Sequence, residues 1–420
     1  MSGSDSGQAE SGGPIVIDPA APYGYSREAG LQQRFELAAA ALLASDGWSG
    51  GGSKELVADL ALEGGGVKGI GIVGAVSALA EAGYRFQRVA GTSAGAIAAA
   101  LIAAISKKGD PMTTLQGYLD NLTFTAPQGK VHAFLDHHLG NAGELLSSAE
   151  VLTHKMGVYE GTYLFTWLEP IMHDLGVHTF ADLKITLEED PGMSLPESHR
   201  YRLLVHTSDV TRGQLVRLPW DYDHYGLDRD TQDVVHAVRA SMSIPFFFEP
   251  VTVTASPAEV DVPSPDGGSI VTRYAGGTVT WVDGGMLRNF PINAFEREDG
   301  GEPRWPTIGV KLSSLQTEYA FTMAADSAFG EARSCLHTMM GEWDAYSVDA
   351  ATAGRTIFVN NAGISTTDFD LTAAQRHELF LNGVSAATDF VIEMGARGGV
   401  PRSESEARQL VRARSATGSR

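Results

Sequence analysis

The pentapeptide Gly91-Thr92-Ser93-Ala94-Gly95 is the part of the sequence best suited to nucleophilic chemistry. A GxSxG motif between a strand and a helix holds its serine on a sharp, strained turn, where the hydroxyl can meet a substrate. Gly91 and Gly95 remove Cβ atoms that would clash in so tight a bend. Ser93 would also lie at a helix N-terminus, where backbone amides favour developing negative charge. A structural turn with an incidental serine is the alternative interpretation.

A second glycine-rich segment, Gly64-Gly65-Gly66-Val67-Lys68-Gly69, also joins an expected strand to an expected helix. Unobstructed amides that converge there suit an anion, either a bound phosphate or the oxyanion of a tetrahedral acyl intermediate. A phosphate-binding P-loop requires GxxxxGK followed by Ser or Thr, whereas Lys68 precedes a glycine here. A dinucleotide GxGxxG fits the segment, but no acidic residue about 20 positions later convincingly ends a second strand. We therefore favour an oxyanion loop over nucleotide binding.

A serine nucleophile needs a base, and two Asp-Gly-Gly tripeptides compete for that role. Asp266 lies among prolines and serines that are typical of a surface turn. Asp283 follows the alternating segment 278–282, so its carboxylate is expected at the end of a strand. We favour Asp283, although an Asp before Gly commonly only caps a turn.

A histidine-dependent triad is the alternative to a serine and an aspartate. The histidines considered after Ser93 are His206, His236, His337 and His377. None lies in a segment that resembles a catalytic loop, and His236 stands within an apolar segment typical of a packed helix. We therefore disfavour a triad.

Two clusters of possible metal ligands are present, and neither is convincing. The segment Asp221 to Gly226 begins like a calcium loop, but Tyr225 and Gln232 occupy its fifth and twelfth positions, and the twelfth requires Glu. A polar helix face or loop equally explains a second group, His132, Asp136, His137 and His138. The sequence therefore predicts no metal and no cofactor.

Apolar segments and helical spacing predict the elements that position these motifs. Residues 56–62 form a short apolar run that ends at the glycine loop, as a buried strand does, and apolar residues at helical spacing follow from 70 to 80. Residues 86–90 predict another strand, and an alanine-rich helix follows the serine turn through residue 105. Alternation of strands and helices predicts a parallel sheet covered by helices. Further strands are expected at 201–207, 214–218, 278–282, 307–312 and 355–360.

Composition excludes several classes of protein. The 420 residues carry a formal net charge of −20, which would repel a nucleic acid backbone. Cys335 is the single cysteine, which rules out an intrachain disulfide and an iron–sulfur site. The N-terminus lacks the basic start and apolar core of a signal peptide, and the weakly polar segment 89–105 is a poor membrane span. We expect a cytoplasmic protein that contacts a membrane surface at most transiently.

Three motifs in this order resemble the patatin-like phospholipase family. Residues 64–69 match its GGGx[RK]G oxyanion loop, residues 91–95 its GxSxG elbow, and Asp283-Gly284-Gly285 its DG[GA] motif. Residues 240–245 and 289–291 add to the likeness, which covers roughly residues 56–390. The resemblance implies a three-layer α/β/α sandwich with a mostly parallel central sheet.

The same resemblance implies a Ser93–Asp283 dyad that releases fatty acid from phospholipid or other acyl esters without a metal. The implied oxyanion hole comprises Gly64, Gly65, Gly66, Val67, Lys68 and Gly69, and the implied nucleophile elbow Gly91, Ala94 and Gly95. Partial burial would make Asp283 a better base, and Lys68 would fix the loop or attract a lipid phosphate. An acyltransferase and a catalytically idle lipid-binding scaffold are the alternatives. Related acyltransferases carry His before the serine, and Thr92 at that position favours hydrolysis.

Three segments are expected along the chain. Residues 1–30 are rich in Gly, Ser and Pro and are expected to be disordered. Residues 31–395 would form the catalytic domain, with a helical, cap-like insertion around residues 110–200. Residues 396–420 carry an excess of arginine and are expected to form a mobile basic tail, which we interpret as a frayed terminus rather than a membrane contact.

Overall fold

A mixed sheet of eight strands lies at the centre of the protein in its computed structural model. The structure describes residues 14–47, 54–120, 157–159, 162–190, 192–264, 268–297, 301–312, 350–364 and 371–417, with the single positions 331, 335, 338 and 339. Within this part of the chain, no helix is both long and apolar enough to cross a membrane.

Five neighbouring strands of the sheet run parallel to one another. In spatial order they are β14 (Thr356–Phe358), β13 (Thr307–Lys311), β3 (Leu56–Leu62), β4 (Tyr84–Thr92) and β6 (Leu203–Asp209). Antiparallel strands complete the sheet, and they are β12 (Gly277–Asp283), β9 (Val251–Ala255) and β7 (Gln214–Leu218). The structure thus confirms the predicted α/β fold with a mostly parallel sheet.

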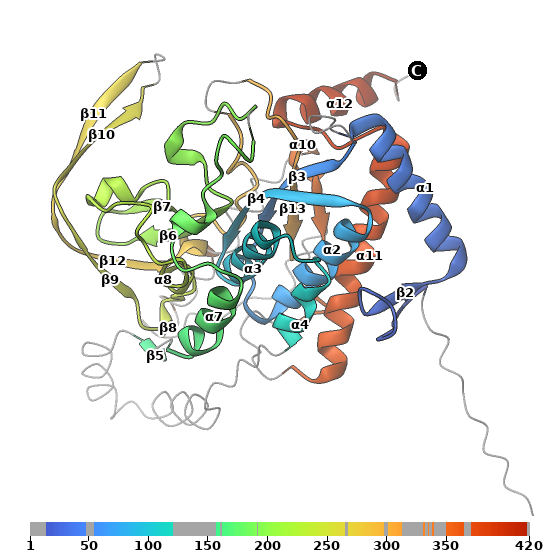
Figure 1. Ribbon diagram of the computed structural model, residues 1–420, viewed down its shortest axis with the longest axis horizontal. Coiled ribbons are helices and arrows are strands. Elements are labelled where there is room, and N and C mark those ends of the chain that lie inside the picture. The colour runs from blue at the N-terminus through green and yellow to red at the C-terminus, as the bar shows by residue number, and fades with distance from the viewer. Residues whose placement is uncertain are drawn as a thin grey trace, which may run out of the picture.

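Helices cover both faces of the sheet (Figure 1). On one side of β3 and β4 lie α2 (Ile70–Glu81), α3 (Ala94–Lys108) and α11 (Ala373–Arg397), and on the other lie α10 (Ala350–Ala353) and α12 (Glu404–Thr417). Helix α1 (Ala29–Asp46) packs on α11, and α4 (Thr114–Asp120) contacts α2 and α3. This arrangement matches the expected three layers.

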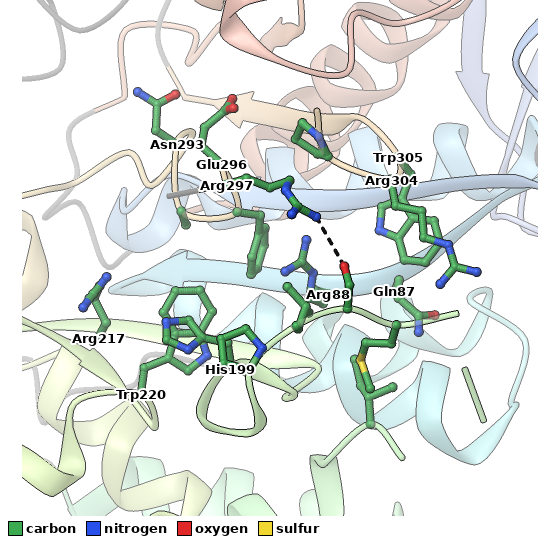
Figure 2. Close-up of a pocket in the computed structure, with 18 of the residues that line it drawn as sticks. Gln87, Arg88, His199, Arg217, Trp220, Asn293, Glu296, Arg297, Arg304 and Trp305 are labelled. Atoms are coloured by element: carbon green, nitrogen blue, oxygen red, sulfur yellow. Dashed lines mark hydrogen bonds between the residues drawn. The ribbon is translucent and has the colours of Figure 1, made fainter. Parts of the chain in front are cut away.

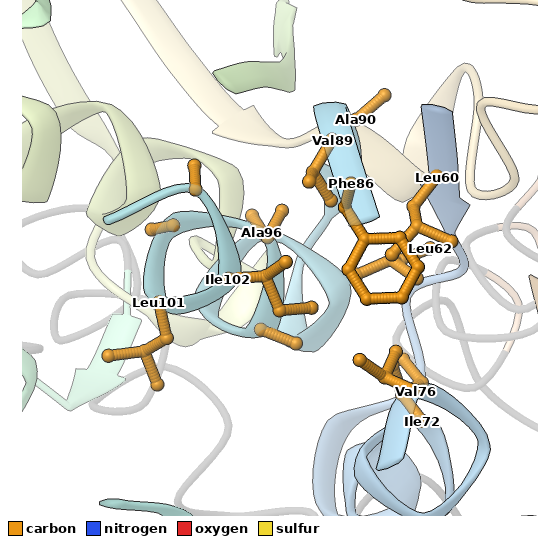
Figure 3. Packing of buried hydrophobic residues seen from close by; sticks show 14 of the residues in the cluster. Leu60, Leu62, Ile72, Val76, Phe86, Val89, Ala90, Ala96, Leu101 and Ile102 are labelled. Atoms are coloured by element: carbon orange, nitrogen blue, oxygen red, sulfur yellow. The ribbon is translucent and has the colours of Figure 1, made fainter. Parts of the chain in front are cut away.

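The core forms because β3 and α3 are apolar on almost every side. All residues of β3 except Val57 are buried, which is typical of a central parallel strand with both faces covered. Residues 94–105 of α3 are buried around the whole helix, and their many alanines let α3 lie close to β4. Figure 3 shows the resulting packing, in which Phe86 and Leu62 contribute from the sheet and Val76 and Ile102 from the helices.

Two strands lie between residues 15 and 27, where the sequence predicted disorder. Strands β1 (Ile15–Ile17) and β2 (Tyr25–Arg27) form an antiparallel hairpin. Arg27 fixes this hairpin to the body, because its buried side chain pairs with Glu81 and donates to Thr388 Oγ1 at 3.0 Å. A composition rich in Gly and Pro does not reveal contacts with partners so distant in sequence.

The middle region is only partly described, and residues 121–156 of the expected helical insertion lie outside the described residues. The elements that the structure gives here are β5 (Gly157–Tyr159), α7 (Thr162–Asp174), and the 3-10 helices η2 (Phe180–Leu183) and η3 (Glu197–His199). Leu168 and Phe180 of this region belong to the main hydrophobic core. The described part of this region therefore shares the main hydrophobic core with the sheet and its helices.

A two-stranded ribbon extends away from the sheet (Figure 1). It consists of β10 (Ala258–Pro263) and β11 (Ser269–Tyr274), which pair antiparallel. The preceding elements are η4 (Tyr222–Tyr225), α8 (Val234–Ser241) and β8 (Phe246–Phe248), and β8 pairs with β5. Asp266, the competing base, belongs to the connection between β10 and β11 and lies outside the described residues.

The C-terminal segment also differs from the expected mobile tail. Residues 404–417 form α12, which packs on α10. Val400 and Ala407 are buried, and Arg408 pairs with Glu404 one turn earlier. Arginine content suggested a frayed end, whereas pairs at i and i+4 and a few buried apolar residues stabilise a helix.

Candidate active site

Strands β4 and β12 meet end to end along one edge of β6. Strand β4 is parallel to β6 and places Thr92 opposite His206, whereas β12 is antiparallel and places Asp283 opposite Thr207. Strand β7 occupies the other edge of β6, so β4 and β12 must share this one. Because they run toward each other, their C-terminal ends meet. Ser93 follows β4 directly and Asp283 ends β12, so the topology brings the predicted nucleophile and the predicted base together.

The turn that carries Ser93 has the expected strained shape. Ser93 has φ 54° and ψ −124°, a backbone conformation that residues with a Cβ rarely adopt. The flanking glycines are required sterically, because a Cβ on Gly91 would collide with the carbonyl of Gly95, and one on Gly95 with that of Leu62. Ala94 begins α3, so Ser93 lies at the N-terminus of that helix as predicted.

Residues at the end of α8 brace both halves of the site. The amide of Ser93 donates to Ser241 Oγ at 2.9 Å, and Ser241 donates in turn to the carbonyl of His206 at 2.6 Å. Two residues later, the carbonyl of Ser243 accepts the amide of Asp283 at 2.9 Å. The sequence of segment 240–245 shows a family likeness but not this bracing role, since the contacts depend on residues distant in sequence.

Asp283 is completely buried, and its carboxylate is only partly satisfied. Oδ1 accepts the amide of Gly285 at 2.7 Å, while Oδ2 has no hydrogen bond of ordinary geometry with the described residues. Burial raises the pKa of Asp283 to about 7, although the Gly285 amide and the nearby Ser93 side chain both lower it. A carboxylate with a pKa near neutrality can accept a proton far better than one near 3.9.

The glycine loop lies against the serine turn. A Cβ on Gly64 would stand 3.0 Å from Ser93 Cβ, and one on Gly69 would stand 3.3 Å from Ala94 Cβ. Gly66 has a φ of +55°, which its lack of a Cβ allows. No hydrogen bond from the amides of Gly65 or Gly66 is found among the described residues, so both remain available to an anion.

Asn289 fixes this loop in place. Its side-chain NH2 group donates to the backbone carbonyl of Gly64 at 3.0 Å. Its backbone carbonyl accepts the amide of Gly64 at 3.1 Å. The amide of Lys68 donates to the carbonyl of Gly65 at 3.2 Å. The amides of Gly64 and Lys68 are thus already engaged, which limits the predicted oxyanion donors to fewer groups than the whole segment 64–69.

The side chains of Val67 and Lys68 differ in their surroundings. Val67 is buried against Ile364 and Leu379. Burial lowers the pKa of Lys68, and the nearby Glu63 carboxylate opposes that change. Glu63 itself pairs with Lys311. Lys68 therefore lies near the ion pair of Glu63 and Lys311, and its role in fixing the loop stays a prediction.

The histidines considered for a triad are not arranged as one in the described residues. His206 is buried beside the site, but its ring nitrogens have no hydrogen-bond partner there, and only its backbone carbonyl braces the turn. His236 is exposed and its ring contacts Phe165, and His377 is exposed on α11. His337 lies outside the described residues.

The described residues hold no group of three or more His, Cys, Asp or Glu side chains suited to a metal. In the segment that begins like a calcium loop, Asp221 pairs with Arg217 and Asp223 pairs with Arg229. The second predicted group, residues 132–138, lies outside the part of the chain that the structure describes.

Solved structures with a related arrangement share little sequence with this chain. VipD from Legionella pneumophila is 17% identical with a TM-score of 0.32, over 80% of this chain and 66% of that one. The type III effector protein ExoU is 19% identical with a TM-score of 0.35, over 81% of this chain and 54% of that one. This chain thus spans about half to two thirds of their lengths, and likenesses this weak carry no functional weight.

Comparisons of sequence are more informative. Residues 60–296 match the family described as Patatin-like phospholipase, which is more than half of the chain. The uncharacterized protein YqhO of Bacillus subtilis is 31% identical over 318 residues, or 76% of this chain and 92% of that protein. The family match supports a lipid hydrolase activity. On this match, and with the elbow, aspartate and glycine loop gathered at one point, the chain belongs to the patatin-like phospholipase family.

Proposed function

We propose that the protein is a serine lipid acyl hydrolase that uses Ser93 as nucleophile and Asp283 as general base. The observation that carries this proposal is the meeting of β4 and β12 along β6, which puts the ends of both strands at adjacent register positions. The substrate would be a phospholipid or a related acyl ester.

In the first half of the reaction, Asp283 accepts the hydroxyl proton of Ser93 while Oγ attacks the ester carbonyl carbon. Negative charge develops on the carbonyl oxygen, and the free amides of Gly65 and Gly66 would stabilise it. Collapse of the tetrahedral intermediate breaks the ester bond, and the protonated Asp283 donates its proton to the departing alcohol. An acyl group then remains on Ser93.

In the second half, Asp283 removes a proton from water, and the hydroxide attacks the acyl carbon. Collapse of this second intermediate returns the proton to Ser93 Oγ and releases the fatty acid. Thr92 precedes the serine, and its hydroxyl donates to the carbonyl of Arg288 at 3.1 Å. It therefore offers no base for a second alcohol, which favours water as the acyl acceptor over acyl transfer.

The test compares wild type with Ser93→Ala, Asp283→Asn and Asp266→Asn on phosphatidylcholine vesicles and on 4-nitrophenyl butyrate. Ser269→Ala, on the exposed strand β11, is the matched control for the serine substitution. We expect Ser93→Ala to abolish release of fatty acid and Asp283→Asn to lower kcat by about 100-fold or more, the scale of a general base. A fluorophosphonate probe should label wild type at Ser93, as peptide mass spectrometry can verify.

Unchanged turnover in Ser93→Ala would overturn the proposal. Loss of activity in Asp266→Asn with retention in Asp283→Asn would reassign the base to the ribbon connection. Transfer of the acyl group to added glycerol in preference to water would identify an acyltransferase.

A further inference from the structure

A cavity of about 600 Å³ has a lining that does not include the proposed catalytic residues. It is bounded by the middle of β4, by β7 and by residues from the segments 185–190, 193–199, 293–297 and 303–305. Figure 2 shows His199, Trp220 and Arg217 facing Asn293, Glu296 and Arg297 across it. Its lining includes neither Ser93, nor Asp283, nor any residue of the glycine loop, so the proposed reaction leaves this cavity without a role.

The cavity has a cationic lining in a strongly acidic protein. Five arginines contribute to it, and they are Arg88, Arg217, Arg288, Arg297 and Arg304. Asp190 and Glu296 are the carboxylates of the lining, and each is already paired, Asp190 with Arg304 and Glu296 with Arg355. A chain with a net charge of −20 would not gather these cations at one cavity by composition alone.

Arg288 supplies positive charge that no neighbour neutralises. Arg88 pairs with Asp59 and Arg217 pairs with Asp221, whereas the guanidinium of Arg288 has no ion pair among the described residues. Its side chain is half-buried where it lines the cavity. An unpaired guanidinium offers several donors in a planar fork that matches the oxygens of a phosphate or carboxylate.

His206 is a second polar residue of the cavity wall. It is 2% exposed, and among the described residues its ring nitrogens have no hydrogen bond of ordinary geometry, although the nearby Arg288 backbone raises its pKa. Burial and the charges of Arg288 and Arg217 lower its pKa to about 3, so the ring is neutral, with one donor and one acceptor. The buried ring therefore adds no charge to the wall beside the Arg288 guanidinium.

Aromatic rings form the apolar part of the wall. Trp220 and His199 lie with their ring centroids 4.2 Å apart, and Phe295 meets Trp220 edge-on at 6.2 Å. The guanidinium of Arg88 lies over Phe295 at 4.4 Å. The indole N–H of Trp220 is buried without an acceptor in the described part of the chain. These surfaces suit a planar or apolar body rather than a bare hydrated ion.

We propose that this cavity binds a small organic anion, whose phosphoryl or carboxylate head contacts Arg288 and whose aromatic or apolar body packs against Trp220 and Phe295. The volume lies in the range of sites for small molecules. The site is independent of the proposed hydrolysis, because none of its side chains takes part in that reaction.

The test is isothermal titration calorimetry of the full chain with 1-naphthyl phosphate, 1-naphthoate, uncharged 1-naphthol and inorganic phosphate. We expect saturable one-to-one binding of at least one of the two naphthyl anions, tighter than that of naphthol or of phosphate alone. The tighter of the two anions identifies the head group. Arg288→Gln should weaken its binding by about tenfold or more, the scale of one charge-assisted hydrogen bond.

Arg273→Gln is the matched control, because Arg273 is an exposed arginine of β11 whose removal changes the net charge equally. Leu215→Trp, which fills the cavity from β7, should also abolish binding. Thermal unfolding of each variant checks that it is folded. If Leu215→Trp does not fold, the comparison of Arg288→Gln with Arg273→Gln still tests the proposed site. Absence of saturable binding by both anions would overturn the proposal, as would equal losses in Arg288→Gln and Arg273→Gln.

Discussion

Under the proposed mechanism, Asp283 couples the chemistry of the site to pH. Its pKa is raised to about 7 by burial, and only the ionised carboxylate can accept the proton of Ser93. We therefore expect kcat/KM for a soluble ester to rise with pH, with a midpoint near 7, and to level off above it. The measurement is a profile of kcat/KM from about pH 5 to about pH 9. A midpoint near 4 would mean that a solvated carboxylate acts as the base.

The same raised pKa makes Asp283 a source of instability at higher pH. Below the ordinary pKa of 3.8, the carboxyl is protonated in both the folded and the unfolded chain, so it does not lower the free energy of unfolding. Between that value and about 7, ionisation of the unfolded chain lowers the free energy of unfolding by about 1.4 kcal/mol per pH unit. Above about 7 the carboxyl is ionised in both states, and the free energy of unfolding falls no further on its account.

Asp283→Asn removes this titration. We expect the Tm of the variant, relative to that of wild type, to be higher at pH 8 than at pH 4. Differential scanning calorimetry can measure this difference at each pH. Asp261→Asn, on strand β10 of the exposed ribbon, is a control for the loss of one carboxylate. An equal change at both pH values would contradict the burial of a titrating carboxyl.

At the scale of elements, Asn289 joins the segment after β12 to the loop after β3. It makes two hydrogen bonds to Gly64, one through its side chain. Asn289→Ala should leave the fold intact but loosen the loop, so kcat should fall by about 10-fold to 100-fold while KM changes little. Steady-state kinetics on 4-nitrophenyl butyrate would measure this.

Asn382→Ala is the matched control for Asn289→Ala, because Asn382 makes one similar side-chain bond, to the carbonyl of Asn360, on the exposed surface. A change in KM alone for Asn289→Ala would show that the residue binds substrate instead of holding the loop. Equal effects of the two substitutions would show a general loss of stability.

Local pattern was enough to predict the elements that carry the motifs. Strand β3 has the predicted bounds of residues 56–62, and β7 those of 214–218, because each has its own apolar signal and turn residues. The direction of β12 and the bracing by Ser241 could not be predicted. Both depend on pairing between segments distant in sequence, for which no residue spacing carries a signal.

At the scale of the whole molecule, Arg27 connects the N-terminal hairpin to the helices α2 and α11. Its side chain is completely buried, lies 3.8 Å from the centre of the Phe35 ring, and pairs with Glu81 at 2.8 Å. Arg27→Leu should lower the free energy of unfolding by about 3 kcal/mol, as breaking a buried pair does. Urea denaturation measures the change.

Arg85→Leu is the matched control, because Arg85 pairs with Glu55 at the surface with 70% of its side chain exposed. It should cost about 0.5 kcal/mol or less. Similar losses in both variants would mean that the hairpin adds nothing to the stability of the body. The sequence composition of residues 14–28 gave no sign of this connection, since it rests on one arginine and partners in other segments.

The head-on approach of β4 and β12 has a consequence for the newly synthesised protein. The ribosome makes the serine turn long before it makes the strand that ends in the acid. A nascent chain, or a truncated one that stops before residue 277, would carry the nucleophile without its base under the proposed mechanism. Hydrolysis would be withheld until synthesis has passed Asp283, so lipid esters would be spared by incomplete copies of the protein.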